Sequence, residues 1–483
     1  MIFNSVTYII FLFLVVLLYW VLPRKPRQVL LFVSSIIFYG LWRFEYTLLV
    51  LVSAINDYGI SILIDKTSNS KRKKGLLIFS LVFNLGLLVY FKYLMFLTTN
   101  AISLLNLFGL EITPLEFSII LPLGISFYTF QTISYTVDVY RGFLKPYRNF
   151  FLYGSYVTFF PQLVAGPILR AKEVIEQLSI RPEFKLSYIS DGVIRILIGL
   201  FLKVVITDNI APMVDEIYLM EVSKLSAIDV WTKAFLFGFQ IYFDFSAYSH
   251  IAIGSAMLMG IQFPENFNYP YLAKSFKAFW KRWHISLSSW IRDYLYLPLL
   301  GEKVQDKSTG GISVSKSSKK GNTNRALFLT WAIMGLWHGA SWAFVFWGVY
   351  HATLILLERF VAKHNSLKGK IRSFLGWIIV FPLAMLSWLP FRDNSLVNVF
   401  KMFKKVLIFE GGLNRSFSEN VYLITFLLTI LVILSYLTYS YLLPILKRNI
   451  FAYGLFLIIV ITFLTALDLT FLRPISQFIY FQF

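Results

Sequence analysis

Long apolar segments recur along the whole chain, and they constrain its fold more than any other feature. The first, residues 2–22, is long enough to cross the hydrocarbon of a bilayer as a helix. Because several segments are shorter than the roughly 20 residues of a full span, we expect about 10–12 transmembrane helices plus re-entrant and interfacial helices. The further segments lie near residues 28–43, 46–64, 76–98, 116–137, 150–168, 189–207, 229–260, 326–338, 341–358, 373–391, 421–443 and 449–467.

Charged residues make up only 14% of the chain and hydrophobic residues 57%, against about 25% and about 45–50% in soluble domains. A soluble protein of this length needs a charged surface, and this sequence does not supply one. The composition therefore predicts an all-α, polytopic membrane protein whose main solvent is the lipid bilayer. No soluble domain is appended, so residues 1–483 are expected to form a single integral membrane domain.

The formal net charge of +20 comes from short basic runs between the apolar segments. Because the cations do not gather on one face, nucleic acid is not an expected partner, and the positive-inside rule explains them. The run that includes Arg24 and Arg27 follows the first apolar segment, which indicates a retained span with its amino end outside and not a cleavable signal peptide. Four basic stretches are expected on the cytoplasmic face: 24–27, 66–74, 302–325 and 363–372.

Two connecting segments differ in composition from the rest. Residues 302–325 are rich in Ser, Gly and Lys, which predicts a flexible basic cytoplasmic loop. Residues 394–411 mix Lys401, Lys404 and Lys405 with apolar residues. That segment is too charged to span comfortably, so it predicts an amphipathic helix at the membrane interface.

The chain has no cysteine, which excludes disulfides, thiolate catalysis and zinc–thiolate sites. The sequence also lacks a Walker-type phosphate loop, an H-E-x-x-H zinc helix and a G-x-S-x-G nucleophile elbow, so ATP-driven pumping, zinc proteolysis and lipase chemistry lose support. No metal site and no permanently bound cofactor are expected. The candidates for proton transfer near neutral pH are the histidines, His250, His284, His338, His351 and His364.

His338 is the strongest candidate for a catalytic group. It follows Trp337 in the nearly uncharged stretch WAIMGLWHGASWAFVFWGVYHA, where Gly335, Gly339 and Gly348 allow close approach of a helix or a ligand. A structural histidine that bridges two helices is the alternative. Ionisable residues inside a membrane usually mark functional sites, which favours catalysis.

His284 lies in FKAFWKRWHISLSSWIRDYLYLPLLG. Aromatic residues, Trp283 among them, recur there at helical spacing, while Arg292 and other cations occupy much of the opposite face. The pattern leaves two interpretations open: a functional histidine, or an interfacial helix anchored at the headgroups by its aromatic and basic residues.

Asp244 stands in the aromatic stretch 238–260, with Gln240 and Tyr248 nearby. A carboxylate in such surroundings needs a partner, either to order helices or to orient a catalytic group, and both interpretations stay open. His250 in the same stretch is expected to be satisfied by its neighbours. His351 is expected to serve packing, and His364 to be solvated in a charged loop.

The segments 122–142 and 159–170 combine Pro and Gly breaks with Gln131, Asp138 and Gln162. Broken helices at membrane depth are tolerated where they line a cavity enclosed by protein, so these segments suggest a tunnel.

Several motifs in order carry a resemblance to a known family. They are FYGLW at 38–42, PLGISFYTFQTISYTVDVYRG, FFPQLVAGPI, YFDFSAYS, FWKRWHISLSSWIRDYLYLPLLG, MGLWHGASWAFVFWG and the closing FIYFQF. With these motifs the chain resembles the membrane-bound O-acyltransferase (MBOAT) family, in particular its bacterial alginate O-acetylation branch. The resemblance covers nearly the whole sequence.

The resemblance implies tilted and broken helices around a central tunnel, in a multi-pass protein of the bacterial cytoplasmic (inner) membrane. It matches His338 to the invariant histidine of the family and His284 to its second active-site position. Residue 250 is His where related proteins often carry Asp, so no family role is assigned to it. Supporting or substrate-binding positions are expected at Asp244, Gln240, Tyr248, Trp283, Arg292 and Trp337.

The expected reaction moves an acyl group, acetyl by preference, from a cytoplasmic thioester donor to a hydroxyl. Acetyl-coenzyme A or an acyl carrier protein would be the donor, and the acceptor would be an extracytoplasmic polysaccharide or a periplasmic or extracellular partner transferase. His338 would act as general base and His284 would orient the acceptor or stabilise the oxyanion. The basic loop 302–325 is expected either to attract an anionic donor or only to signal topology.

Three alternatives stay open at this stage. Similarity to the teichoic-acid D-alanylation protein allows D-alanyl transfer from a carrier protein. From other classes, the chain could be a transporter or flippase of a polysaccharide export system, or a structural membrane subunit of a polysaccharide synthase. The two histidine motifs favour an enzyme over the latter two.

Overall fold

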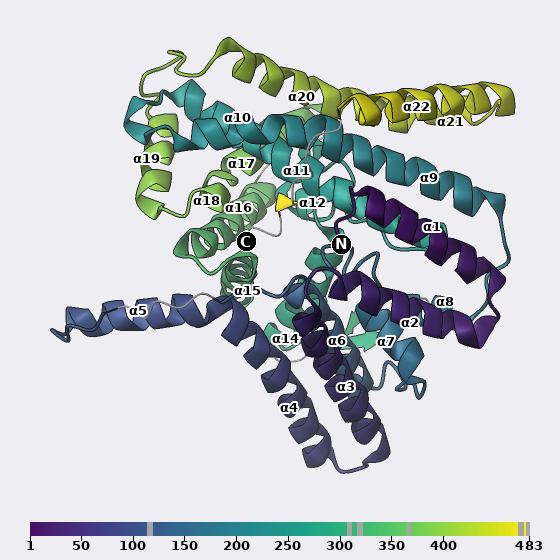
Figure 1. Cartoon of the computed structure of the whole chain (residues 1–483). Helices are drawn as coiled ribbons and strands as arrows, with labels where there is room; N and C mark the ends of the chain where they lie inside the picture. Colours follow the sequence, from purple (N-terminus) through teal and green to yellow (C-terminus); the bar gives the residue numbers. More distant parts are fainter. Residues whose placement is uncertain (114–118, 307–311, 316–321, 365–368, 472–477, 480–483) are drawn as a thin grey trace.

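The computed structural model describes residues 1–113, 119–306, 312–315, 322–364, 369–471 and 478–479, and helices dominate this part of the chain (Figure 1). The amino-terminal half contains α1 Val6–Val21, α2 Arg24–Gly40, α3 Phe44–Lys66, α4 Ser70–Leu88, the π-helix η1 Val89–Tyr93, α5 Leu94–Leu107, α6 Ile125–Arg141, α7 Phe150–Thr158, α8 Ala171–Ser179, α9 Leu186–Leu200, the π-helix η2 Phe201–Thr207, α10 Asp208–Leu219 and η3 Val222–Lys224.

The carboxyl-terminal half begins with α11, the longest single element, and continues through short helices to a group of long ones. Its elements are α11 Ala227–Met257, η4 Pro270–Leu272, α12 Phe276–Trp280, α13 Ile285–Ile291, the π-helix η5 Arg292–Tyr296, α14 Leu297–Leu299, β1 Lys303–Asp306, β2 Ile312–Ser315, α15 Thr323–His338, α16 Trp342–His364, α17 Gly369–Leu386, α18 Leu389–Arg392, α19 Leu396–Leu407, α20 Glu419–Leu437, η6 Thr438–Leu442, α21 Leu443–Leu446 and α22 Ile450–Thr470.

Six helical stretches among the described residues are long and apolar enough to cross a membrane: Phe44–Lys66, Ser70–Leu107, Trp342–Ala362, Ile371–Arg392, Glu419–Leu446 and Phe451–Thr470. Away from their ends they expose large apolar side chains, and Phe426 on α20 and Ile458 on α22 are each more than half exposed. Such extended apolar surface is suited to lipid contact. The prediction of an all-α polytopic membrane protein is confirmed, while the expected total of about 10–12 crossings, which includes shorter helices such as α1, stays a prediction.

The helix α11 is the buried centre of the molecule (Figure 1). It begins at a capping box in which the Ser226 hydroxyl accepts a hydrogen bond from the backbone N–H of Asp229. The helix packs against α9, η2 and α10. The helices α9 and α11 lie so close at Gly199 that a Cβ there would be 2.8 Å from the carbonyl oxygen of Ala247. Glycine on α9 therefore lets α11 sit deep inside the helical assembly.

The helices α15 and α16 form a tight hairpin through two glycines. A Cβ at Gly335 would lie 2.1 Å from the carbonyl oxygen of Phe344, and one at Gly348 would lie 2.0 Å from that of Trp331. The chain turns between the helices at Gly339, whose extended backbone ends α15 directly after His338. The apolar segments 326–338 and 341–358 therefore form two separate helices, and the hairpin fixes where His338 lies.

Residues 276–296 do not form the continuous helix that their aromatic spacing indicates. The chain leaves the helical conformation after α12 and resumes it at α13, with His284 between them. The backbone N–H of Ile285 donates to the carbonyl oxygen of Asn266 at 3.0 Å, a contact from outside the segment that holds the turn. The expectation of one continuous helix over this stretch is therefore wrong, while its location at the membrane interface stays a prediction.

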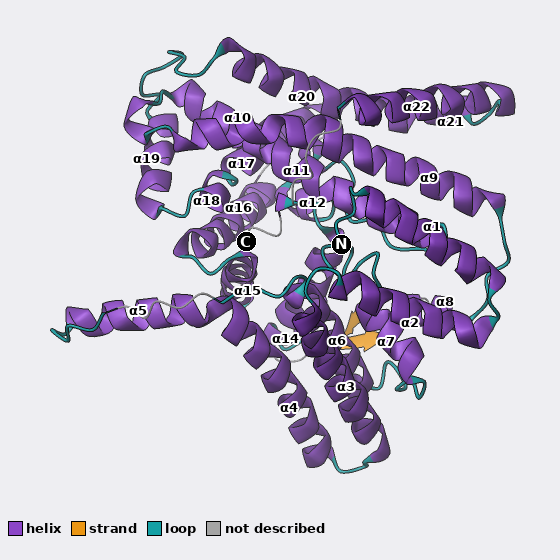
Figure 2. Ribbon diagram, in the orientation of Figure 1, coloured by secondary structure: helices purple, strands orange, loops and turns teal. Residues whose placement is uncertain are grey.

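The predicted loop 302–325 contains a short antiparallel hairpin, the orange element in Figure 2. Strand β1 pairs with β2, and Lys303 lies opposite Ser315. Apolar and polar residues alternate only over the four residues of β2, ISVS, which is too short a pattern to predict a strand from the sequence. Residues 307–311 and 316–321 lie outside the described part, so the flexibility and the cytoplasmic location of this loop stay predictions.

The segment 394–411 is helical, as its composition predicts. It forms α19, which buries Val399 and Met402 and leaves Lys401 exposed. An amphipathic helix of this kind is suited to an interface between lipid and water, although its depth in the membrane stays a prediction.

Replacing Gly348 by Ala is expected to destabilise the α15–α16 hairpin. The added methyl group would meet the backbone of Trp331, and overpacking of this kind costs about 1–3 kcal/mol. Thermal unfolding of purified protein in lipid nanodiscs measures the effect. The matched control is Gly86→Ala on α4, where a Cβ meets nothing within 4 Å. Equal unfolding temperatures for the two variants would show that the hairpin does not depend on this contact.

Candidate active site

His338 is the last residue of α15 and is only 4% exposed. Aromatic rings surround its imidazole: the ring centroids of Trp337, Trp347 and Phe391 lie 4.8, 4.9 and 5.1 Å away. The rings come from α15, α16 and α18, so three helices shape this environment. A low-polarity enclosure strengthens electrostatic interactions with any reacting group that enters it.

His284 is fully buried at the break between α12 and α13. Its backbone adopts the left-handed conformation, with φ 41° and ψ 57°. This conformation costs a non-glycine residue roughly 1–2 kcal/mol and persists where the surroundings impose it, often at functional sites. The imidazole lies 4.6 Å from the ring of Phe245 on α11 and 6.2 Å from that of Phe127 on α6, measured between centroids.

The indole of Trp337 lies next to both histidines. Its ring centroid is 4.8 Å from that of His338 and 6.2 Å from that of His284. Trp337 stacks on Phe130 at 5.4 Å, and Phe130 stacks on Trp290 at 3.9 Å. The Trp290 indole N–H also donates to the carbonyl oxygen of Phe130 at 2.9 Å. Residues far apart in the sequence therefore build one aromatic wall, and both histidines lie beside its Trp337 end.

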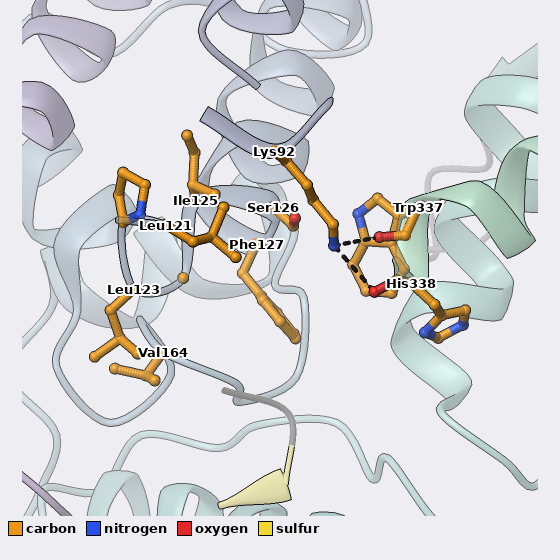
Figure 3. Close-up of a pocket in the computed structure, with 11 residues that line it drawn as sticks. Lys92, Leu121, Leu123, Ile125, Ser126, Phe127, Val164, Trp337 and His338 are labelled. Carbon is orange, nitrogen blue, oxygen red and sulfur yellow. Dashed lines mark hydrogen bonds between the residues drawn. The ribbon is translucent and has the colours of Figure 1, made fainter. Parts of the chain in front are cut away.

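Lys92 on η1 anchors the end of α15 and was not among the predicted site residues. Its Nζ donates to the carbonyl oxygens of Trp337 at 2.6 Å and His338 at 3.1 Å (Figure 3). The hydroxyl of Tyr93 donates to the carbonyl oxygen of Leu336 at 3.0 Å. The last carbonyls of a helix have no partner within the helix and carry partial negative charge, so these donors stabilise the turn that ends in His338.

One sequence signal could have indicated Lys92. It is the only charged residue between Lys74 and Glu111, within an otherwise apolar stretch. A lone cation at such a place usually has a function. It also lies in a π-helical turn, a feature that often marks functional sites.

A small pocket of about 60 Å³, open on one side, lies between Lys92 and residues 121–127. We call it the Lys92 pocket. Figure 3 shows Lys92, Ser126 and Phe127 around it, with the imidazole of His338 beyond the backbone that bonds to Lys92. Both broken segments, 122–142 and 159–170, contribute residues to its lining, as expected of segments that border a cavity. The lining residues are Lys92, Leu121, Pro122, Leu123, Gly124, Ile125, Ser126, Phe127, Val164, Trp337 and His338.

A larger pocket, of about 440 Å³, lies against the opposite half of the α15–α16 hairpin. We call it the basic pocket. Lys277, Lys281, Arg292 and Arg359 contribute cations to it, and Trp280, Trp331 and Met334 contribute apolar surface. Along α15, the basic pocket touches Leu327 to Met334 and the Lys92 pocket touches Trp337 and His338. The end of α15 therefore separates two cavities; a continuous tunnel between them stays a prediction.

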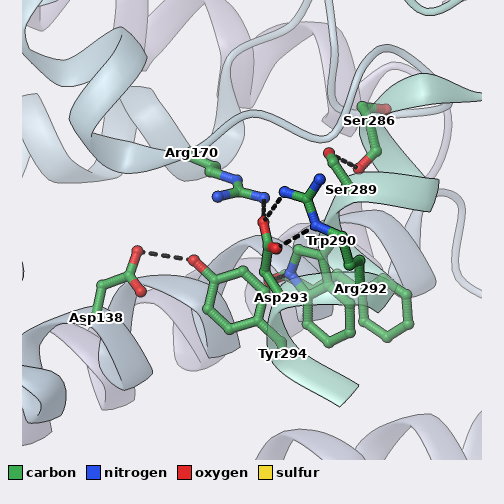
Figure 4. A network of polar contacts seen from close by, with 9 residues as sticks. Asp138, Arg170, Ser286, Ser289, Trp290, Arg292, Asp293 and Tyr294 are labelled. Carbon is green, nitrogen blue, oxygen red and sulfur yellow. Dashed lines mark hydrogen bonds and ion pairs between the residues drawn. The ribbon is translucent and has the colours of Figure 1, made fainter. Parts of the chain in front are cut away.

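Arg292 belongs to a network of charges at the edge of the basic pocket (Figure 4). Its Nε donates to Asp293 at 2.7 Å, and the same carboxylate binds Arg170. Tyr294 donates to Asp138 at 2.8 Å. This network ties η5 to α6 and to the segment before α8, so Arg292 has a structural partner as well as access to the pocket.

Asp244 takes part in a buried ion-pair cluster. Lys203 Nζ lies 2.9 Å from Oδ1 of Asp244 and 2.9 Å from Oδ1 of Asp208. The backbone N–H of Ile479 donates to Oδ2 of Asp244 at 2.5 Å. These contacts join α11 to η2, α10 and the carboxyl-terminal segment, which favours the helix-ordering interpretation of Asp244. Its neighbour Phe245 supplies the contact to His284.

The other predicted supporting residues lie at different distances from the two histidines. Trp337 contacts both, as described. Trp283 stacks on Phe279 at 5.8 Å and lies 4.7 Å from Trp388, next to His284 in sequence. Tyr248 stacks on Phe3 at 4.5 Å, and Gln240 is buried on α11 one turn before Asp244. A role for these residues in substrate binding stays a prediction.

The remaining histidines behave differently. His351 is fully buried and accepts a hydrogen bond from the indole N–H of Trp280 at 3.4 Å, consistent with the packing role expected for it. His250 lies on α11 and lines neither pocket. His364 is the last residue of α16, and its side chain lies outside the described part of the structure.

Comparison with known proteins places this arrangement in a family. Residues 144–386, which include His284 and His338, match the model of the membrane-bound O-acyltransferase family. The chain is 35% identical to the protein named probable alginate O-acetylase of Azotobacter vinelandii, over 90% of this chain and 85% of that protein. It is 34% identical to the peptidoglycan O-acetyltransferase of Helicobacter pylori, over 80% of this chain and 75% of that protein.

A third relative is more distant. The teichoic acid D-alanyltransferase of Bacillus subtilis is 30% identical, over 50% of this chain and 60% of that protein. The family match, the extent of the first similarities and the apolar helices agree with one another. The chain belongs to the membrane-bound O-acyltransferase family and is a multi-pass membrane O-acyltransferase.

Proposed function

We propose that the protein transfers an acetyl group from a cytoplasmic thioester to a hydroxyl of an extracytoplasmic polysaccharide or of a partner transferase, in the bacterial cytoplasmic membrane. The observation that carries the proposal is the position of His338 and His284. Both are buried beside Trp337, where the end of α15 separates the two pockets. Substrates that approach from opposite faces would meet at such a place.

The basic pocket is suited to the donor. Both acetyl-coenzyme A and the phosphopantetheine arm of an acyl carrier protein carry phosphate, which the cations of this pocket would attract. The ends of α15 and α16 on this side lead to the basic stretches 302–325 and 363–372, which are expected to face the cytoplasm. The Lys92 pocket, at the other end of α15, is then the side from which the acceptor arrives.

The chemistry follows from the two imidazoles. As the acceptor oxygen bonds to the thioester carbonyl carbon, His338 takes the hydroxyl proton. The carbon–sulfur bond then breaks, and the proton passes to the departing thiolate. His284 orients the acceptor or donates a hydrogen bond to the oxyanion of the tetrahedral intermediate. Neither step requires a bound metal or a resident cofactor.

Similarity to the teichoic acid D-alanyltransferase supports a second candidate within the same chemistry, D-alanyl transfer from a carrier protein. It covers a smaller share of this chain than the similarity to the O-acetylase relatives. Acetyl transfer is therefore the first choice, and parallel assays with acetyl and D-alanyl donors separate the two. Family membership favours an enzyme over a flippase or a structural subunit.

His338→Ala is expected to lower acyl transfer by about a hundred- to ten-thousandfold, because the general base is lost. His284→Ala is expected to lower it as well. Mass spectrometry of O-acyl groups on envelope glycans measures the activity, and immunoblotting of membranes checks that each variant is present. The matched control is His250→Ala, which alters a histidine that lines neither pocket and is expected to retain activity. Acylation at the wild-type level in His338→Ala would remove the proposal.

The double variant Lys277→Gln/Arg359→Gln is expected to raise KM for acetyl-coenzyme A by about three- to tenfold with little change in kcat, because it weakens attraction of the phosphates. The increase should shrink at high salt. Steady-state kinetics in nanodiscs, with acetyl-coenzyme A and an acetylated carrier protein compared as donors, measures it. The control Lys274→Gln/Arg372→Gln removes two exposed cations that do not line the basic pocket. An unchanged KM for every accepted donor would place the donor elsewhere.

A further inference from the structure

Thr330 on α15 is only 4% exposed, and its hydroxyl has no hydrogen-bond partner among the described residues. Threonines within helices usually donate to a carbonyl oxygen of the preceding turn. Thr232, Thr353 and Thr425 do so, with donor–acceptor distances of 2.7–2.8 Å. The hydroxyl of Thr330 forms no such bond, which costs free energy unless a ligand supplies the missing partner.

Thr330 lines the basic pocket, so a molecule bound there can reach its side chain. The serine hydroxyls of the same lining already have partners. Ser288 donates to the carbonyl oxygen of Trp283 at 3.3 Å, and Ser289 donates to that of Ser286 at 2.9 Å. A threonine hydroxyl both donates and accepts hydrogen bonds, so it is suited to an amide, which offers a carbonyl oxygen and an N–H group.

The residues of α15 that line the basic pocket lie on the same face of the helix as His338. Steps of three or four residues lead from one to the next and then to His338, which is the spacing of a single helix face. The pocket itself ends one helical turn before the imidazole. The lining residues on this face are Leu327, Thr330, Trp331 and Met334.

The cations of the basic pocket include one at the far end of this face. The helix α16 runs back along α15, and a Cβ at Gly348 would lie 2.0 Å from the carbonyl oxygen of Trp331. Arg359, further along α16, therefore lies toward the start of α15. A ligand that extends along α15 would have a cation at one end and the imidazole of His338 at the other.

The length of a phosphopantetheine arm matches the distances along α15. Thr330 lies about 12 Å before His338 along the helix axis, and Leu327 lies about 17 Å before it. In an extended acetyl thioester, the carbonyl carbon of the amide nearer the phosphate lies about 11 Å from the thioester carbon, and the phosphorus atom about 17 Å. A thioester carbon beside His338 therefore places this amide, the outer amide, at the level of Thr330.

We propose that Thr330 is a specificity-determining residue for the acyl donor and that its hydroxyl binds the outer amide of the phosphopantetheine arm. The assignment of the basic pocket to the donor rests on the proposed function, while the unpaired hydroxyl is a property of the fold. A short thioester without the outer amide leaves Thr330 unpaired, so the pocket selects thioesters of phosphopantetheine against it.

Calorimetry with full-length protein in lipid nanodiscs tests the proposal without acyl transfer. One probe is a non-reactive ketone analogue of acetyl-coenzyme A, and the second is the same molecule with two methylene groups in place of the outer amide. We expect Thr330→Val to bind the first probe about tenfold more weakly than wild-type protein does and the second probe equally well. A carrier protein whose phosphopantetheine bears the same ketone group compares the two sources of the arm.

Two further variants make the test specific. Thr330→Ser keeps the hydroxyl and is expected to keep the affinity for the first probe. The matched control Thr425→Val changes a buried threonine that lines neither pocket, and it is expected to keep this affinity as well. Thr330→Val removes no hydrogen bond between described residues, so its thermal unfolding temperature is expected to be no lower than that of wild-type protein.

The outcomes separate this proposal from the proposed function. Unchanged affinity for the first probe in folded Thr330→Val overturns the role of Thr330, even if His338→Ala abolishes acyl transfer. Equal weakening of both probes, or the same loss in Thr425→Val, also overturns it, because the effect would not belong to a contact between Thr330 and the outer amide. Normal transfer in His338→Ala would overturn the proposed catalytic group and leave these affinities as evidence for Thr330.

Discussion

The carbonyl groups at the end of α15 need hydrogen-bond donors, and the geometry of the site depends on how the chain supplies them. Lipid offers no donors, so they come from the protein. Lys92 and Tyr93, on a π-helical turn far away in the sequence, bind the carbonyl oxygens of Leu336, Trp337 and His338. The position of His338 is thus set by a contact between η1 and the tip of the α15–α16 hairpin. Close packing of α15 against α16 at the glycines of that hairpin holds α15 itself in place.

This anchored turn is the point at which separate parts of the chain converge. Phe130 of α6 and Trp290 of α13 form the wall on which Trp337 stacks, and the strained turn at His284 brings a second imidazole to the same indole. Each pocket then reaches one side of α15. A rigid aromatic wall between two openings is suited to a reaction whose substrates arrive from opposite faces, because the reacting groups are held in place before either substrate binds.

The sequence predicts the elements of this site better than their arrangement. The class of fold follows from apolar length and low charge, and His338 stands out as an imidazole in an uncharged stretch. The break at His284 cannot be predicted from the local sequence, because it depends on hydrogen bonds that Ile285 and Ser286 donate to Asn266, outside the aromatic segment. Lys92 is a comparable case: its isolation in an apolar helix is visible, but its partners lie on α15 and only the fold brings them together. Asp244 needed a partner, as its surroundings predict, and only the structure identifies Lys203.

The central claim is that the acyl group is transferred beside His338, between the basic pocket and the Lys92 pocket. A cryo-electron microscopy structure of the protein with a non-reactive ketone analogue of acetyl-coenzyme A tests it most directly. We predict that the phosphates lie among Lys277, Lys281 and Arg359 and that the ketone oxygen lies within hydrogen-bond distance of an imidazole of His338 or His284. An analogue whose ketone group lies away from both histidines, with the aromatic wall around Trp337 unchanged, would contradict the account.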